Sequence, residues 1–333
     1  MSSIMTNASA MTALKTLQAT NKALETTQAR ISTGYRVSEA SDNAAYWSIA
    51  TTMRSDNKSL STVQDALGLG AAKIDTAYTG IKAAIDVVDE IKAKLVAARE
   101  PGVDRAKIQS EITALQGQLT SNAAASTFSG ENWLSVDSSA TGYNASKTMV
   151  SSFTRAADGS VSVGTIAVDT SSIKLFDAAT DAAAAGTGIL DAKYTSVDIV
   201  GPPAYTAGDR LADQSTATGA TVFTVASLDI SALTNSAADL STLEAYISGV
   251  DNAIGLMTTA ASDLGAAKKR VDLQMEFTSN LMDTIDRGVG TLVDADMNKE
   301  STRLQALQVQ QQLGIQALSI ANGNSQTILS LFR

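Results

Sequence analysis

The chain has 333 residues, of which 44% are hydrophobic, 5% aromatic and 18% charged, and its formal net charge is −9. This acidic balance argues against nucleic-acid binding, because no excess of basic residues can neutralise phosphates. Cysteine and histidine are absent, which excludes disulfides, thiolate catalysis, Cys/His metal sites and a serine–histidine triad.

Neither a membrane span nor a cleavable export signal is visible. No window reaches 18 consecutive apolar residues, and residues 1–30 lack a basic start followed by a continuous apolar run. From the residues alone we expect a protein that does not enter the membrane, and that either stays in the cytosol or leaves the cell without a cleaved peptide.

The first 33 residues form a periodic apolar segment with the spacing of a helix. Its large apolar residues are Ile4, Met11, Leu14, Leu17, Leu24 and Ile31. Gly34 is placed to end this helix, and the polar stretch Gly34–Asn43 predicts a joint between two helices. Within the joint, Ser41 or Asp42 is expected to cap the helix that follows.

The stretch from Ile49 to Ala98 carries the strongest pattern in the chain. Apolar residues recur there at every seventh position: Met53, Leu60, Leu67, Ile74, Ile81, Val88 and Leu95. A second row of mostly small or apolar residues lies three positions after each of these. Together the two rows predict a coiled-coil seam. A helix from about Asn43 to Arg99 would be roughly 80 Å long at ~1.5 Å per residue, and Pro101-Gly102 would stop it.

A shorter helix and a β-rich middle are expected next. Asp104 can cap a helix whose apolar face would fold back along the first rod, at Ile108, Ile112, Leu115 and Leu119. Residues 126–135 leave helical periodicity, with Phe128 and Trp133 as anchors. Between Val136 and Ser236, the runs Thr148–Thr154 and Ser160–Val168 flank Asp158-Gly159 and predict a hairpin. Two further strand-like runs, Thr195–Val200 and Thr221–Leu228, complete a head of undefined topology.

A second rod follows the middle. Its seam is Leu243, Val250, Met257, Leu264, Val271 and Ile285, with a companion row four residues after each at Ile247, Ile254 and Ala261. Two rods of similar length on either side of the middle predict an out-and-back, antiparallel arrangement with both termini at one end. Arg287-Gly288-Val289-Gly290 is expected to interrupt this rod at the level of the first joint.

The last segment, Leu304–Phe332, contains no charged residue. Its large apolar residues are Leu304, Leu307, Val309, Leu313, Ile315, Leu318, Ile320, Ile328, Leu329, Leu331 and Phe332. On a helical wheel they exceed one stripe, so a two-helix pair with the first segment would leave some in water, at roughly 1.5–3 kcal/mol for each side chain. The many glutamines disfavour lipid, since amides are costly there. We therefore expect the two terminal segments to be buried in an assembly of many copies.

Two sequence signatures resemble those of bacterial flagellins. The first includes Arg30, Ser32, Gly34 and Arg36, followed by Asp42-Asn43-Ala44-Ala45. The second runs from Asp294-Ala295-Asp296-Met297 through Gln310-Gln311-Gln312 to Phe332-Arg333. The resemblance covers about residues 1–135 and 240–333, and is greatest to flagellins of rhizobia and related soil alphaproteobacteria.

The resemblance implies a mainly α-helical fold with a small β-rich insertion, in which both chain ends build a long antiparallel bundle. Residues 1–43 with 290–333 would form an inner, channel-lining coiled coil. Residues 44–150 with 237–289 would form a helical rod domain with a β-hairpin, and residues 151–236 a variable, surface-exposed outer domain.

The resemblance also implies function and partners. The chain would be a secreted, extracellular subunit that polymerises into the flagellar filament used for swimming, with other flagellins as possible co-assembling partners. It would leave the cell through the flagellar type III apparatus with an export chaperone, and meet a filament cap and hook-associated proteins. No cofactor is implied.

Three alternatives remain open. A hook–filament junction protein shares the terminal helices, and a soluble signalling coiled coil shares the heptads. An enzyme has little support, because Asp294, Asp296 and Glu300 lie near a predicted helix start, where acidic residues usually act as caps.

Overall fold

The computed structural model describes residues 7–178, 187–196, 210 and 222–331, with side chains up to residue 323. The chain divides into two compact units. One contains residues 1–59 and 280–333, and the other contains residues 60–279. Mainly α-helical structure with small sheets in the middle confirms the predicted fold class.

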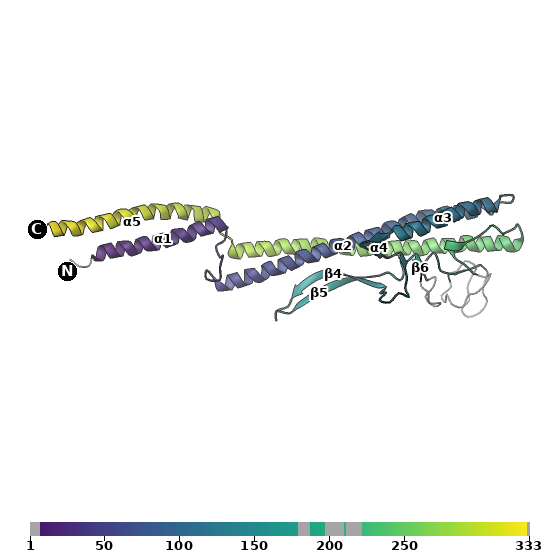
Figure 1. Cartoon of the computed structure of the whole chain (residues 1–333), viewed down its shortest axis with the longest axis horizontal. Coiled ribbons are helices and arrows are strands. Elements are labelled where there is room, and N and C mark those ends of the chain that lie inside the picture. Colours follow the sequence, from purple (N-terminus) through teal and green to yellow (C-terminus); the bar gives the residue numbers. More distant parts are fainter. Residues whose placement is uncertain (1–6, 179–186, 197–209, 211–221, 332–333) are drawn as a thin grey trace. The chain divides into compact units, whose positions relative to one another are not determined.

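In the first unit, helices α1 (Ala8–Thr33) and α5 (Met297–Leu331) form an antiparallel pair (Figure 1). The Asn7 side-chain amide donates to the Ala321 carbonyl at 2.9 Å, and Gln311 donates to Asn21 at 2.8 Å. Arg30 and Glu300 form an ion pair at 3.2 Å. Because these contacts pair early residues of α1 with late residues of α5, they fix the antiparallel direction.

The joint between α1 and α2 (Ala44–Ala97) lies where the sequence predicts it. Gly34 ends α1 with a φ of 75°, a left-handed conformation that favours glycine. The predicted cap of α2 is wrong: Asn43 accepts the Tyr46 N–H at 3.1 Å. Asp42 instead accepts the N–H groups of Ser38 and Glu39 at 3.0 and 3.2 Å, because the joint has its own turn to stabilise.

Helix α4 (Ala237–Val293) does not break at residues 287–290, so the predicted interruption there is wrong. The chain leaves the helix only at residues 294–296, before α5. Two glycines cost a helix about 1 kcal/mol each, and burial of Val289 and Val293 against Val37 and Ala50 offsets that cost.

In the second unit, α2 and α4 run antiparallel in one constant register. Asp75 and Lys268 pair at 2.5 Å, Lys92 pairs with Asp251, and Arg99 pairs with Glu244. Each step forward on α2 equals the step backward on α4, so the two helices stay aligned between these pairs.

The seam residues predicted on both rods line the interface in this unit. Leu67, Ile74, Ile81, Val88 and Leu95 of α2 are fully buried, as are Leu243, Val250, Met257, Leu264 and Val271 of α4. Leu60 is buried at 3% exposure. In the first unit, Met53 and Ile285 are partly buried against Val289 and its neighbours.

The companion row predicted on α4 needs correction. Ala253, Ala260 and Ala267, three residues after the first row, are buried, whereas Ile254 and Ala261 are only partly buried. Small alanine side chains suit the narrow interface, while the row one residue further packs on the edge of the core.

Asp104 caps helix α3 (Arg105–Ala125), as predicted: its side chain accepts the N–H groups of Ala106 and Lys107. Ile112 and Leu119 are fully buried against α2 and its neighbours. Buried Arg105 donates to the carbonyls of Ala98 and Leu233 at 2.9 and 3.0 Å. It thereby links the ends of three helical segments.

The strands are short except for one hairpin. β1 (Thr127–Phe128) pairs with β2 (Glu131–Asn132), and β3 (Ser135–Val136) pairs in parallel with β6 (Phe176–Asp177). β4 (Ser146–Arg155) and β5 (Val161–Asp169) form the predicted hairpin, with Gly159 at a φ of 86° in its turn. β7 (Tyr194–Thr195) pairs with β8 (Val222–Phe223), followed by the 3-10 turn Val225–Ser227.

The described strands and loops pack on the same hydrophobic core as the helices. Trp133 is 3% exposed, and Ile173, Leu175, Leu190 and Val225 are fully buried in the cluster that contains the α2–α4 seam. Strand β4 extends past residue 150, although the register of the hairpin shifts between Val150 and Ser152. The division at residues 43, 150, 236 and 290 stays a prediction.

Candidate functional site: the terminal helix pair

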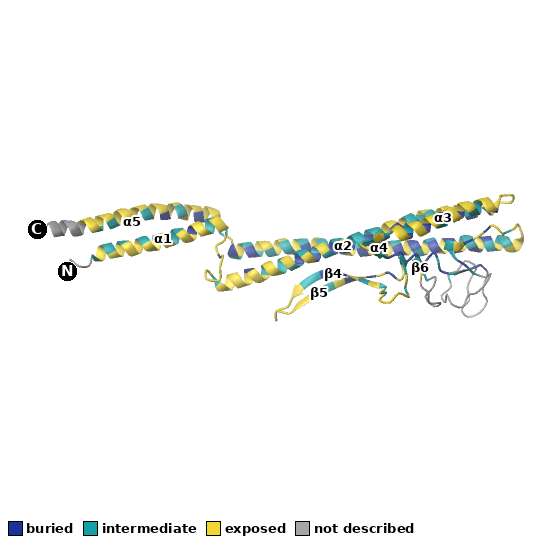
Figure 2. Cartoon of the chain, viewed as in Figure 1, coloured by how far each residue is buried: buried dark blue, intermediate teal, exposed yellow. Residues whose placement is uncertain are grey.

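The α1–α5 pair exposes large apolar side chains that water-soluble helix pairs normally bury. Met11 and Leu14 of α1 are 54% and 45% exposed, and four large apolar residues of α5 are more than half exposed: Val309, Leu313, Ile315 and Ile320. Figure 2 shows exposed and intermediate surface along most of both helices. Since α5 carries no charge after Arg303, no charged side chain interrupts this apolar area along the rest of the helix.

The other apolar residues predicted to form the core of the assembly are less exposed or lie outside the described side chains. Leu17, Leu24, Ile31, Leu304 and Leu318 are partly buried, and Leu307 is buried at 8% exposure. Ile4 and Phe332 lie outside the described residues, and so do the side chains of Ile328, Leu329 and Leu331. One helix therefore gives its partner only part of the cover that its apolar surface needs.

A hollow of about 510 Å³ runs between the two helices. It is lined by Ser9, Thr12, Ala13 and Thr16 of α1 and by Gly314, Ala317 and Ala321 of α5. The two backbones approach closely nearby, where a Cβ added to Gly314 would lie 3.2 Å from Leu17. Small side chains here leave a groove beside the exposed large ones, which suits knobs-into-holes packing with further helices.

The signature residues hold the joint together. The Gly34 carbonyl accepts the Ala295 N–H at 2.8 Å, and the Val293 carbonyl accepts the Arg36 N–H at 2.6 Å. The Arg36 guanidinium donates to the Leu292 carbonyl at 2.9 Å. Hydrogen bonds from the Ser38 and Glu39 backbone lower the pKa of Asp42. Ser32, Ala44 and Ala45 are exposed.

Three contacts of the pair were not anticipated from the sequence. They are the Asn7–Ala321 and Asn21–Gln311 hydrogen bonds and the burial of Thr27 at 1% exposure. Thr27 lies three residues after Leu24, so extending the apolar row to include polar residues would have found it.

The acidic residues near the start of α5 have structural contacts. The Asp296 side chain accepts the N–H groups of Asn298 and Lys299 at 3.0 and 3.2 Å, Glu300 pairs with Arg30, and Asp294 lies in a bridge with Tyr35. Among the described residues, no group of three acidic or other ligating side chains could hold a metal ion, and no helix is long and apolar enough to cross a membrane.

Paired terminal helices with an uncovered apolar surface, continued by heptad rods, define a class of self-associating helical structural subunits. Residues 4–139 match the bacterial flagellin N-terminal helical region, and residues 247–332 match the bacterial flagellin C-terminal helical region. This chain belongs to the bacterial flagellin family.

Similar proteins match the full length of the chain. Flagellin C of Rhizobium meliloti (strain 1021) is 54% identical over 335 residues, and flagellin A of Rhizobium meliloti is 48% identical over 403 residues. A flagellin of Brucella melitensis is 46% identical over 334 residues. Each match covers 100% of both chains, which confirms the resemblance to rhizobial flagellins.

Proposed function

We propose that the α1–α5 pair is the surface through which this chain, a structural subunit of the extracellular bacterial flagellar filament, polymerises. The observation that carries the proposal is the exposure of Leu313, Ile315 and Ile320 on the part of α5 that has no charged residue after Arg303 and that α1 covers on one side. Burying a large apolar side chain contributes roughly 1.5–3 kcal/mol. Six such side chains in each copy give a substantial driving force for packing many copies around one axis.

Ordering of the chain ends and assembly are coupled in this proposal. A pair with a large uncovered apolar surface gains little from folding alone, because ordering entropy opposes it. The lattice supplies the missing cover, so the innermost layer becomes stable where neighbouring copies are present. Residues 1–43 and 290–333 would then line the central channel.

The proposal also includes specific protein partners of the chain. They are the flagellar export chaperone, the filament cap, the hook-associated proteins and co-assembling flagellins, and their support is membership of the family. The proposal includes no cofactor and no catalysis. In its support, Asp296 and Glu300, two of the acidic residues considered for an enzyme, serve a cap and an ion pair.

Seeded polymerisation tests the proposal. Acid-dissociated protein is returned to neutral pH with filament seeds, and polymer is measured by sedimentation and electron microscopy. We expect seeds to grow into long tubes, and a chain lacking Leu304–Arg333 to stay in the supernatant.

The same experiment separates the alternatives. A discrete, soluble dimer that ignores seeds would contradict the proposal and favour a signalling coiled coil. Binding of single copies to seed ends without further growth would favour a hook–filament junction protein.

A further inference from the structure

Asn322 and Gly323 form the one asparagine–glycine pair in the sequence, and both are exposed on α5. Every other asparagine of the chain is followed by a residue with a side chain. Glycine destabilises a helix at this position, because it gains the most conformational freedom on unfolding. Packing does not require it: in the part of the chain that the structure describes, a Cβ added to Gly323 would meet no atom within 4 Å. The pair therefore weakens α5 locally without a packing reason.

The pair lies at the level where α1 begins. Asn7, the cap of α1, donates to the Ala321 carbonyl at 2.9 Å. From there α1 runs back along α5 towards its start, while α5 continues to Leu331. The helical residues of α1 therefore cover α5 only up to about Asn322. A helix with packing on few sides opens more readily than one in a core.

An exposed asparagine–glycine pair can cyclise through its own backbone. The Gly323 nitrogen attacks the side-chain amide carbon of Asn322, and a C–N bond forms while the side-chain nitrogen leaves as ammonia. The attacking nitrogen gives its proton to solvent, and the leaving nitrogen takes one from solvent. Water then opens the five-membered succinimide at either carbonyl, which gives aspartate or isoaspartate. Glycine favours the first step because it has no side chain to block the approach.

The helical conformation of α5 opposes this reaction. In an α-helix each backbone N–H donates to the carbonyl four residues earlier, so the Gly323 nitrogen cannot reach the Asn322 side chain while the helix is intact there. The attack requires local opening, and its rate follows the population of the open state. Packing by neighbouring copies, as proposed for the terminal pair, would lower that population further.

Either product places a negative charge in a segment that has none. Leu304–Phe332 contains no charged residue, and Asn322 lies seven residues after Ile315, which puts the two on one face of α5. Ile315 and Ile320 are 55% and 67% exposed. A carboxylate buried among such side chains without a cation is strongly unfavourable. Isoaspartate also adds a methylene to the backbone, which disrupts the helical hydrogen bonds.

We infer that Asn322 is a site of spontaneous deamidation whose reaction depends on the assembly state of the chain. In the free chain the site opens and deamidates, and the product polymerises poorly. In the polymer the helix stays closed and the amide is preserved. The inference rests on the proposed function, and it adds a chemical limit on the time for which a free subunit can still assemble. Water is the only co-reactant.

Mass spectrometry of the full-length chain tests the site directly. Washed polymer, and free chain below the critical concentration, are held in one buffer, sampled over time and cleaved with trypsin after Arg303, which releases Leu304–Arg333. Fragment ions locate the mass gain of deamidation, and enzymatic methylation with protein isoaspartyl methyltransferase measures isoaspartate. We expect Asn322 to react about 10-fold or more faster in the free chain, where the helix opens more often. Asn324, followed by Ser325, is the internal comparison and should react more slowly.

A partition experiment tests the consequence for assembly. Free chain is incubated until part of it is modified at Asn322 and is then concentrated, fresh seeds are added, and the polymer is sedimented. The ratio of modified to unmodified chain should be about 10-fold or more higher in the supernatant than in the polymer, because the lattice disfavours an unpaired charge.

Three variants separate the reaction from its effect. Gly323→Ala should suppress the modification and keep polymerisation, because there is space for the methyl group. Asn322→Asp carries the charge of the product from the start and should raise the critical concentration about 10-fold or more. Asn322→Gln is the matched neutral control and should change it less than about 2-fold, since it adds no charge.

Four results would overturn the inference. They are an Asn322 amide that stays intact in the free chain, equal rates in free chain and polymer, equal ratios in polymer and supernatant, and normal assembly of Asn322→Asp. Each of them leaves the proposed function intact as long as fresh chain extends seeds. Fresh chain that does not extend seeds would reject the proposed function and the link between deamidation and assembly together.

Discussion

Single side chains link the helical rods to the short strands. Glu131 of β2 accepts hydrogen bonds from Lys73 of α2 at 2.6 Å and from Lys147 of β4 at 2.9 Å. Partial burial raises the pKa of Glu131, but the two lysines outweigh that effect and lower it from 4.5 to about 2. The carboxylate therefore holds three elements together while it is ionised.

This ion pair predicts a pH dependence of stability. Because the pKa of Glu131 is lowered on folding, its contribution is fully present above pH 4.5 and is lost as the pH falls towards 2. Because water screens this partly exposed carboxylate, Glu131→Gln should cost only about 1 kcal/mol at pH 7, with the difference shrinking as the pH falls. Urea unfolding followed by Trp133 fluorescence in a Trp47→Phe background checks this. A difference that is constant from pH 7 to pH 2 would contradict it.

Gly80 of α2 is required by a close approach. A Cβ there would lie 2.3 Å from the Ser126 hydroxyl and 2.5 Å from Leu134, whereas Gly117 of α3 has open space around it. Gly80→Ala should destabilise the second unit by about 1–3 kcal/mol.

The matched control is Gly117→Ala, which should stabilise the same unit by about 0.5–1 kcal/mol through helix propensity. Thermal unfolding by circular dichroism measures both changes. Equal effects of the two substitutions would show that the Ser126–Leu134 contact does not constrain Gly80.

At the scale of elements, the packing of α2 against α4 depends on which row of α4 residues faces α2, because that row has small side chains. Ala260 is 1% exposed and Ala261 is partly buried. Ala260→Leu should overpack the interface and cost about 1–3 kcal/mol, whereas Ala261→Leu should cost less than about 1 kcal/mol. The free energy of unfolding in urea distinguishes them, and a larger cost at Ala261 would favour the row predicted from the sequence.

Heptad positions could be read from the sequence on both rods because their spacing is local. The second row of α4 could not, since Ile254 and Ala261 compete with Ala253 and Ala260, each one position earlier. Which row faces α2 depends on the rotation of α4, and that is set by packing with α2 and the strands. Likewise, Gly288 and Gly290 suggested a break, but buried Val289 and Val293 keep α4 continuous.

At the scale of the whole molecule, a single copy leaves large apolar side chains of its terminal helices exposed. Ile315 is 55% exposed, and Gln316 beside it is also exposed. Ile315→Ala should leave the unfolding of the single chain nearly unchanged, because little burial is lost there. It should raise the critical concentration for polymerisation about 10-fold or more, since assembly loses a buried side chain.

Gln316→Ala is the control for this substitution and should change the critical concentration less than about 2-fold. Sedimentation of seeded reactions at a series of protein concentrations gives both values. Equal effects of the two substitutions would contradict a role for the apolar surface of α5 in assembly.

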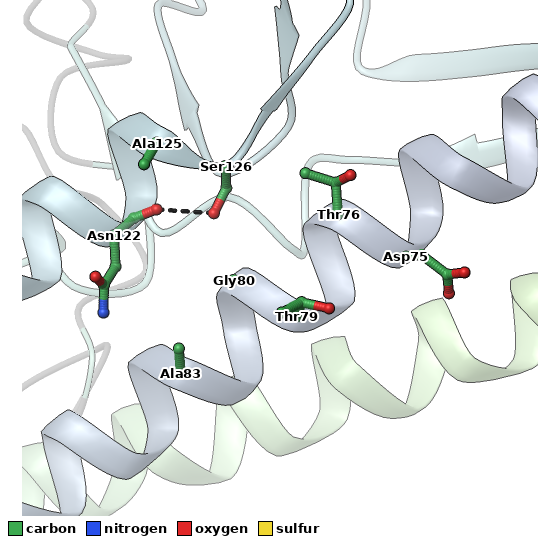
Figure 3. A pocket seen from close by; sticks show the side chains of 8 residues that line it. All are labelled: Asp75, Thr76, Thr79, Gly80, Ala83, Asn122, Ala125 and Ser126. Carbon is green, nitrogen blue, oxygen red and sulfur yellow. Dashed lines mark hydrogen bonds between the residues drawn. The ribbon is translucent and has the colours of Figure 1, made fainter.

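The sequence by itself determined the long helices, the main seam, the joint after Gly34, the hairpin at Asp158-Gly159 and the uncharged apolar end. Each of these depends on periodicity or turn chemistry within a short stretch. Only the tertiary structure decided that Asn43 caps α2, that α4 continues to Val293, and that small residues of α2 and α3 leave a hollow between these helices (Figure 3). These features depend on which surfaces meet in space, and residues far apart in the chain set that jointly.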